Sequence, residues 1–172
     1  MTLKQVFDAG TIGSRVAELA AEIDGVYHGE TVLAVCVLKG AFPFYSDLVR
    51  AMKTDVMMDF VRLASYGDGT QSGEVVRMTK DVETSLQGRH VLIVEDIVDS
   101  GRSMDFLMRT FCARGAKSVR LATLIDKKER RLFPVRSDFV GFDLPSGFLV
   151  GYGLDYAERY RALPAIYELL DC

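Results

Sequence analysis

Apolar residues recur at helical spacing in three stretches of the chain. The first stretch has them at Ile12, Val16, Leu19, Ala20 and Ile23, at intervals of three and four that place them on one face of a helix. The same spacing recurs in residues 44–51 and 104–111, and the last stretch is followed by Gly115, a residue type that often terminates helices. We predict an amphipathic helix in each stretch.

Short apolar runs without alternation lie between these stretches and are typical of strands buried in a parallel sheet. They cover residues 32–38, 56–63, 90–94 and 119–125. A polar, glycine-rich stretch (residues 65–74) follows the second run and is too long for a tight hairpin, and a short returning strand is predicted at 75–78. Shorter strands joined by turns are predicted further on, in DFVGF and FLVGY.

Strands that alternate with helices predict an α/β fold with a mostly parallel sheet covered by helices on both sides. The chain has 172 residues, which suits one domain, and it shows no internal repeat or linker. Such sheets bind ligands in the loops at the carboxyl ends of their strands. Polar residues directly after each apolar run are therefore the candidates for function.

The segment VLIVEDIVDSGRSM, residues 91–104, is the most informative. It predicts a buried strand, then the acids Glu95 and Asp96, then small residues and Gly101 before a helix. Backbone N–H groups and hydroxyls before a helix N-terminus can bind a phosphate. The two acids repel phosphate but suit sugar hydroxyls or a divalent cation beside it. The segment therefore predicts a ribose-5-phosphate site.

Two nucleotide-binding motifs and one structural role are the other interpretations of this segment. The G-x-x-x-x-G-K-[ST] motif is absent because Asp96 stands where its first glycine is needed, and no G-x-G-x-x-G follows a strand. The structural alternative is an acidic loop in which Ser100 or Ser103 caps the helix.

Composition narrows the classes of protein further. The net charge of −3 argues against a dedicated nucleic-acid binder, and no apolar run is long enough to span a membrane. The N-terminal residues contain no apolar signal-peptide core. Cys36 and Cys112 lie in apolar elements, so we expect buried free thiols and a cytoplasmic protein.

Residues 91–104 resemble the phosphoribosyl pyrophosphate-binding motif of type I phosphoribosyltransferases. Further segments resemble the hypoxanthine-guanine branch of that family, and the likeness extends from about residue 32 to residue 167. They are LKG at 38–40, SYG at 65–67, LIDKK at 124–128 and DFVGFDLPSGFLVGYGLDYAERYR at 138–161.

The resemblance assigns roles to single residues. Asp99 is the implied general base, and the ribose and 5-phosphate contacts are Glu95, Asp96, Ser100, Gly101, Arg102 and Ser103. Leu38, Lys39, Gly40 and Arg161 are implied to bind pyrophosphate, across a cis, non-proline peptide in that loop. Ser65 and Tyr66 open the implied catalytic lid loop. The implied purine contacts are Lys127, Phe148, Leu149 and Asp155, and the implied ligands of Mg²⁺ are Glu95, Asp96 and Asp155.

The resemblance also implies an architecture and an assembly. It implies one phosphoribosyltransferase domain over residues 1–172, with a core at about 30–130 and a small hood built from the two terminal segments. It implies a purine-salvage enzyme that takes phosphoribosyl pyrophosphate and a 6-oxopurine. The enzyme is expected to be a dimer or tetramer, with Phe42, Phe44 and Tyr45 in an apolar contact surface, and to need no nucleic acid or membrane.

The sequence differs from the common residues of the family at a few positions, and it is compatible with other functions. Ser100, Arg102 and Ser103 replace the threonine, lysine and threonine that are common in the family, which should preserve phosphate binding. Leu149 and Gly153 are expected to flank the base, where members vary, so the preferred purine is undecided. The alternatives are a xanthine- or uracil-type enzyme, an RNA-binding regulator on the same fold, and a nucleotide-binding module without catalysis. A regulator would need a basic face around residues 127–131, which we interpret as base recognition plus solvated surface.

Overall fold

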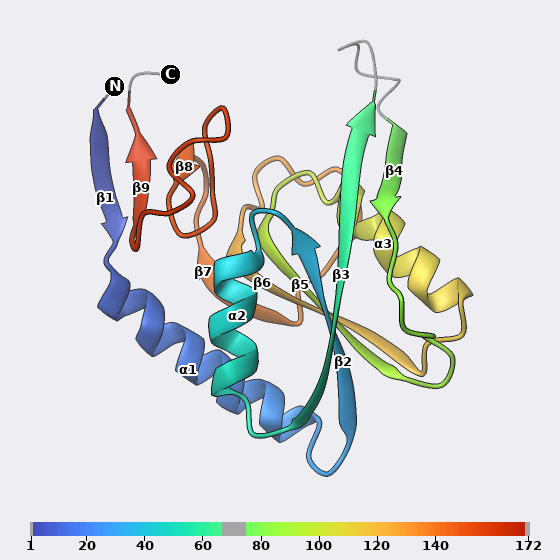
Figure 1. The fold of residues 1–172 in the computed structure, drawn as a ribbon. Helices are drawn as coiled ribbons and strands as arrows, with labels where there is room; N and C mark the ends of the chain where they lie inside the picture. Colours follow the sequence, from blue (N-terminus) through green and yellow to red (C-terminus); the bar gives the residue numbers. More distant parts are fainter. Residues whose placement is uncertain (1, 67–74, 171–172) are drawn as a thin grey trace.

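A six-stranded sheet forms the centre of the molecule (Figure 1). The computed structural model describes residues 2–66 and 75–170. The strands lie in the order β4-β3-β2-β5-β6-β7, and all neighbours run parallel except the hairpin of β3 and β4. Their bounds are β2 Thr31–Leu38, β3 Asp55–Tyr66, β4 Val75–Lys80, β5 His90–Val98, β6 Ser118–Asp126 and β7 Phe139–Asp143.

Helices cover both faces of this sheet (Figure 1). The helices α1 (Ala9–Val26) and α2 (Phe42–Ala51) lie on one face, and α3 (Arg102–Ala113) lies on the other. The apolar face predicted for α1 is buried as expected. Residues 32–37 of β2 are all buried because both sides of the strand are covered, which explains their uninterrupted apolar run. The predicted α/β fold is confirmed.

A second, three-stranded sheet joins the two ends of the chain. It has the order β1-β9-β8, with β1 at Leu3–Phe7, β9 at Ile166–Leu169 and β8 at Leu149–Val150, and its pairs are antiparallel. The sequence analysis did not predict β1 or β9. The division of one domain into a core and a hood remains a proposal, in which the hood corresponds to this smaller sheet and the turns that follow β8.

Three details differ from the expectations. Strand β5 continues through residues 95–98 because those residues still pair with β6, so Glu95 and Asp96 lie within the strand and not after it. Phe44 and Tyr45 lie on the buried face of α2. Of the three residues named for the expected contact surface, only Phe42 is exposed. Cys36 is buried as expected, whereas Cys112 is exposed. Among the described residues, no helix has the length and apolar character needed to cross a membrane.

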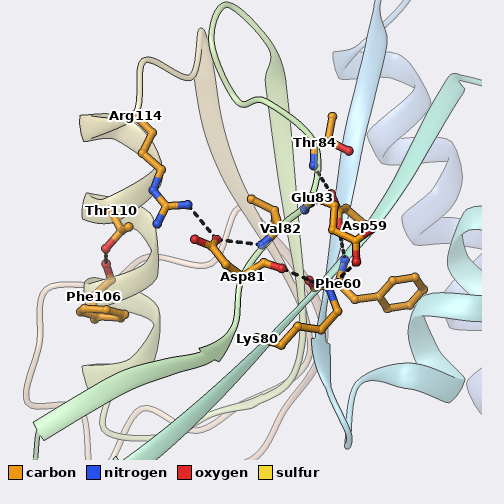
Figure 2. A network of polar contacts seen from close by, with 10 residues as sticks. All are labelled: Asp59, Phe60, Lys80, Asp81, Val82, Glu83, Thr84, Phe106, Thr110 and Arg114. Carbon is orange, nitrogen blue, oxygen red and sulfur yellow. Dashed lines mark hydrogen bonds and ion pairs between the residues drawn. The ribbon is translucent and has the colours of Figure 1, made fainter.

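The base of the β3–β4 hairpin is fixed by polar contacts around Asp59 and Asp81 (Figure 2). The Asp59 carboxylate accepts hydrogen bonds from the backbone N–H groups of Phe60, Glu83 and Thr84 at 2.7, 3.0 and 2.8 Å. Next to it, Asp81 accepts hydrogen bonds from Val82 N–H and from the Arg114 guanidinium at the end of α3, both at 2.7 Å. These contacts hold the end of β4 against β3 and α3.

Replacing Asp59 with asparagine is expected to lower the free energy of unfolding by about 2–3 kcal/mol at pH 7, because backbone donors lose a charged acceptor. Burial would raise the pKa of Asp59, but the backbone hydrogen bonds outweigh it and the pKa is lowered. A lowered folded-state pKa gives stability that is present above the unfolded value of 3.8 and is lost as the pH falls. Urea denaturation at pH 7 and below pH 4 should therefore show a difference between variant and wild type that shrinks in acid.

The matched control for this experiment is Asp55→Asn, at the exposed start of the same strand, where the carboxylate accepts a hydroxyl hydrogen bond from Thr31 at 2.9 Å. Its cost should stay within about 0.5 kcal/mol. Equal costs for the two variants would contradict the assignment of Asp59 as the anchor of the hairpin.

Candidate active site

The candidate site lies where the carboxyl ends of β2, β5 and β6 meet the turns after β8. These three strands are neighbours in the sheet, with β5 between β2 and β6, so the loops that follow them are adjacent. Two cavities open there. One of about 160 Å³ is lined by the loop between β5 and α3, and one of about 330 Å³ is lined by the ends of β5, β6 and β8.

The smaller cavity has the properties of an anion site. It is lined by Glu95, Ile97, Val98, Asp99, Ser100, Gly101, Ser103 and Met104. Gly101 is the N-cap of α3, with a φ of 84° that favours glycine, and no side chain caps the helix from this position. Gly101 and not a serine therefore occupies the N-cap, although the Ser100 hydroxyl accepts a hydrogen bond of 3.4 Å from Arg102 N–H at the start of the helix. The dipole and N–H groups of the first turn are arranged to receive an anion, and the Arg102 side chain packs over the Phe133 ring at 4.9 Å.

The larger cavity brings together residues that are far apart in the sequence. It is lined by Asp96, Ile97, Asp99, Lys127, Arg130, Gly147, Phe148, Leu149, Leu154 and Asp155. Phe148 is 44 % exposed and meets the Tyr156 ring edge-on at 5.6 Å, so its ring can still accept a flat ligand. Lys127 is buried, which lowers its pKa, and its Nζ donates a hydrogen bond of 2.6 Å to the Gly147 carbonyl.

Asp99 lines both cavities. Its Oδ1 atom is buried and accepts no hydrogen bond from any residue that the structure describes. Its Oδ2 atom lies 3.9 Å from Nη1 of Arg130. The Asp99 side chain as a whole is 38 % exposed and lines the larger cavity, so its carboxylate is suited to take a hydrogen bond or a proton from a ligand there.

Glu95 and Asp96 follow each other in β5 and border different cavities, because successive residues of a strand point to opposite faces. Burial raises the pKa of both carboxyls, and for Glu95 the charge of Asp96 raises it further. A cation beside the pair would relieve this cost. In the described part of the chain, no group of three or more acidic, histidine or cysteine side chains could hold a metal ion by itself.

The loop after β2 is packed tightly against both the core and the turns after β8. The peptide between Leu38 and Lys39 is cis, as the resemblance implies. A Cβ atom on Gly40 would lie 1.7 Å from Oδ2 of Asp96, and one on Gly153 would lie 1.9 Å from the Gly40 carbonyl oxygen. Gly153 therefore packs against the loop after β2 and does not line the larger cavity, contrary to the expectation that it flanks the base.

The turns at residues 151–161 place Asp155 and Arg161 at the edge of the site. The backbone of residues 151–159 forms two turns, closed by isolated bridges between Gly151 and Leu154 and between Tyr156 and Arg159. Oδ2 of Asp155 accepts a hydrogen bond from Glu158 N–H at 2.9 Å, and Oδ1 lies 2.8 Å from Nη2 of Arg161. Asp155 thus caps a turn and also faces the larger cavity.

Ser65 and Tyr66 form the end of β3, and the Arg77 guanidinium lies 5.7 Å from the centre of the Tyr66 ring. The rest of the expected lid loop, residues 67–74, lies outside the described residues. The roles of these two residues, like the other residue roles implied by the resemblance, stay predictions.

Arg131 lies beside the candidate site and hydrogen-bonds to the loop that carries Asp99, which the sequence pattern does not indicate. It was expected on the solvated surface, but its guanidinium pairs with the buried carboxylate of Asp126. Its Nε donates a hydrogen bond to the Asp99 carbonyl at 3.0 Å, and Nη1 donates one to the Val135 carbonyl at 2.6 Å. No periodicity or motif marks this residue, because its partners are backbone carbonyls from other segments.

Comparison with known proteins identifies the family of the chain. Residues 2–157 match the family described as phosphoribosyl transferase domain. The chain is 48 % identical to the hypoxanthine-guanine phosphoribosyltransferase of Bacillus subtilis, over 90 % of this chain and 86 % of that protein. It is 47 % identical to a bifunctional TilS/HprT protein of Listeria innocua, over 95 % of this chain but only 25 % of that protein.

The fold agrees as well. A crystal structure of a hypoxanthine-guanine phosphoribosyltransferase from Bacillus anthracis, with a HEPES molecule in its active site, superposes with a TM-score of 0.93. It is 38 % identical, and the match covers 99 % of this chain and all of that one. The chain therefore belongs to the hypoxanthine-guanine phosphoribosyltransferase family.

Proposed function

We propose that the chain transfers the 5-phosphoribosyl group from phosphoribosyl pyrophosphate to N9 of hypoxanthine or guanine in purine salvage. The bond between the anomeric carbon and the pyrophosphate oxygen breaks, the bond from that carbon to N9 forms, and the N7 proton leaves to Asp99. The products are IMP or GMP and pyrophosphate. The observation that carries this proposal is that Asp99 lines both cavities, with one buried oxygen that no described residue bonds.

The smaller cavity is proposed to hold the 5-phosphate, on the backbone and hydroxyls of residues 99–103. The ribose would lie against Glu95 and Asp96. Pyrophosphate would bind the loop at residues 38–40 together with Arg161, whose Nε is buried without a described partner. Closure of the loop that begins at Ser65 and Tyr66 would exclude water and prevent hydrolysis of the activated sugar.

Magnesium is the proposed cofactor. Glu95, Asp96 and Asp155 are the proposed protein ligands, because they offer carboxylate oxygens and a cation would relieve the raised pKa values of the two buried acids. These residues do not gather into a metal site by themselves, so the substrate has to complete it. Magnesium prefers few protein carboxylates and takes its other ligands from phosphates, hydroxyls and water. Bound there, it would neutralise charge on the departing pyrophosphate.

The larger cavity is proposed to select the base. The Lys127 ammonium would donate a hydrogen bond to the oxygen at C6 of the purine, while Phe148 stacks on the ring and the Leu149 backbone contacts it. An adenine presents N–H donors at C6, so the Lys127 N–H that points toward C6 would find no acceptor on the base. Asp155 would close the cavity at its edge.

Assembly and location are proposed as well. The exposed apolar side chains of Phe42, Met57 and Met58 support contact between copies in a dimer or tetramer. The unpaired thiol of Cys36 supports a reducing, cytoplasmic setting.

The test of the proposed function is a base-competition assay with phosphoribosyl pyrophosphate, magnesium and one base at a time. Hypoxanthine and guanine are expected to be converted, adenine and uracil are not, and a chelator should abolish turnover. The rate with xanthine relative to the other two defines the preference. Conversion of uracil alone would contradict the proposal, and failure with every base would favour a regulatory protein on this fold.

The same assay with Lys127→Ala examines the source of selectivity. The variant should lose affinity for hypoxanthine while its KM for phosphoribosyl pyrophosphate changes little. Lys128→Ala is the matched control, because Lys128 is exposed and pairs with Asp143 at 2.7 Å. Unchanged base affinity in Lys127→Ala would show that another group reads the purine.

A further inference from the structure

Glu158 bridges the two side-chain cations that the proposed function assigns to pyrophosphate. Its Oε2 lies 2.8 Å from Nζ of Lys39, and its Oε1 lies 3.2 Å from Nη2 of Arg161. Lys39 follows β2 and Arg161 belongs to the turns after β8, so Glu158 connects the two parts of the structure that border the site. The Glu158 side chain is 64 % exposed and is not needed to fill the core.

The backbone around Glu158 places it there by a tight turn. Tyr156 and Arg159 exchange two backbone hydrogen bonds of 3.2 and 3.0 Å. Between them, Ala157 and Glu158 have φ values of 49° and 64°, as in a type I′ turn, which asparagine and glycine usually form. The Glu158 N–H also donates its hydrogen bond to Asp155. The carboxylate is thus presented by a defined turn and not by a loose loop.

The negative charge of Glu158 acts on the two cations beside it, Lys39 and Arg161. The hydrogen bonds from Lys39 and Arg161 lower the pKa of Glu158, so it is a carboxylate throughout the neutral range. Two cations that face a carboxylate are partly neutralised and attract a second anion less strongly. A diphosphate that binds Lys39 and Arg161 has to replace the Glu158 carboxylate on both of them.

We propose that Glu158 is an affinity-determining residue for the diphosphate group. Its carboxylate occupies Lys39 and Arg161 in the ligand-free protein, and phosphoribosyl pyrophosphate displaces it on binding. The same competition weakens the hold on the product pyrophosphate and so favours its release. This inference rests on the proposed function, because it takes the pyrophosphate contacts from there.

The test is pyrophosphate binding in the presence of magnesium, measured by titration calorimetry on the full chain. Glu158→Gln keeps the shape of the side chain and removes its charge, and it should bind pyrophosphate about 3- to 10-fold more tightly than wild type. The KM for phosphoribosyl pyrophosphate should fall in parallel, and the KM for hypoxanthine should not change. Glu158→Ala should show the same direction.

The matched control is Glu83→Gln, which removes the charge of another exposed glutamate that pairs with a lysine, Lys80 at 3.3 Å, at the base of the β3–β4 hairpin. It should leave the dissociation constant of pyrophosphate unchanged. Unchanged or weaker pyrophosphate binding in both Glu158 variants would overturn the inference and make Glu158 a brace for Arg161. A wild-type protein that neither binds pyrophosphate nor converts a purine would instead contradict the proposed function.

Discussion

Replacing Asp99 with asparagine is expected to lower kcat by about 10²–10⁴-fold, the usual contribution of a general base. The Asp99 carboxylate lines the larger cavity, and its Oδ2 atom lies 3.9 Å from Nη1 of Arg130, too far for a hydrogen bond that would have to break when a purine N7–H arrives. An asparagine can fill the same space and accept a hydrogen bond through its oxygen, but it cannot take the proton. The loss should therefore appear in the chemical step.

The KM for phosphoribosyl pyrophosphate should change little in this variant. The proposed phosphate contacts come from backbone groups and hydroxyls at the start of α3, and an isosteric change leaves them in place. Single-turnover kinetics should accompany kcat, because product release or lid opening can limit steady-state turnover and hide a slower chemical step.

Asp143→Asn is the control, since Asp143 is 63 % exposed at the end of the edge strand β7 and pairs only with Lys128 among the described residues. It should retain wild-type rates. If Asp99→Asn also retained the wild-type single-turnover rate, the proton of N7 would have to leave by another route.

Replacing Arg131 with methionine is expected to lower the free energy of unfolding by about 3–5 kcal/mol, because Asp126 would be left as an uncompensated buried charge. Asp126 is 3 % exposed and pairs with the Arg131 guanidinium. The guanidinium also donates hydrogen bonds to the carbonyls of Asp99 and Val135, at 3.0 and 2.6 Å. Chemical denaturation of variant and wild type measures the cost.

Arg130→Met is the control for stability, because the Arg130 side chain is 80 % exposed and its loss should cost within about 0.5 kcal/mol. A double variant, Asp126→Leu with Arg131→Met, separates stability from positioning. It should recover most of the stability, since replacing a buried ion pair by apolar side chains is often neutral. The kcat of the double variant should remain below that of the wild type, because the Asp99 carbonyl no longer accepts a hydrogen bond from the side chain at position 131. Full recovery of kcat would assign Arg131 a role in stability alone.

The strands and helices of the large sheet could be predicted because each one buries an apolar face that a few consecutive residues reveal. Strands β1 and β9 could not, since LKQVF and IYEL are short, contain polar residues and gain their order from pairing with each other. The extent of β5 was underestimated for a similar reason. Glu95 and Asp96 do not look like strand residues, and only the pairing with β6 keeps them in the sheet.

The candidate site also contains some residues that the sequence predicts and others that it does not. Residues 95–103 could be proposed from the sequence because the acids, the glycine and the helix start are contiguous. The position of Arg131 could not be predicted, because it hydrogen-bonds to Val98, Asp99 and Asp126, and only the fold brings these residues together. The place of Gly153 was predicted wrongly because neighbours in sequence do not reveal a contact with Gly40, more than a hundred residues earlier.

The pairing of β1 with β9 also has a consequence for synthesis on the ribosome. The six-stranded sheet has all its residues once Asp143 has been made, whereas β1 must wait for residues 166–169. A nascent chain that ends at Asp143 carries residues 99–103 but lacks Phe148 and Leu149. On the proposed function, such a chain has the residues assigned to the 5-phosphate before it has those that stack on the base, so the phosphate site can form earlier in synthesis than the complete purine site.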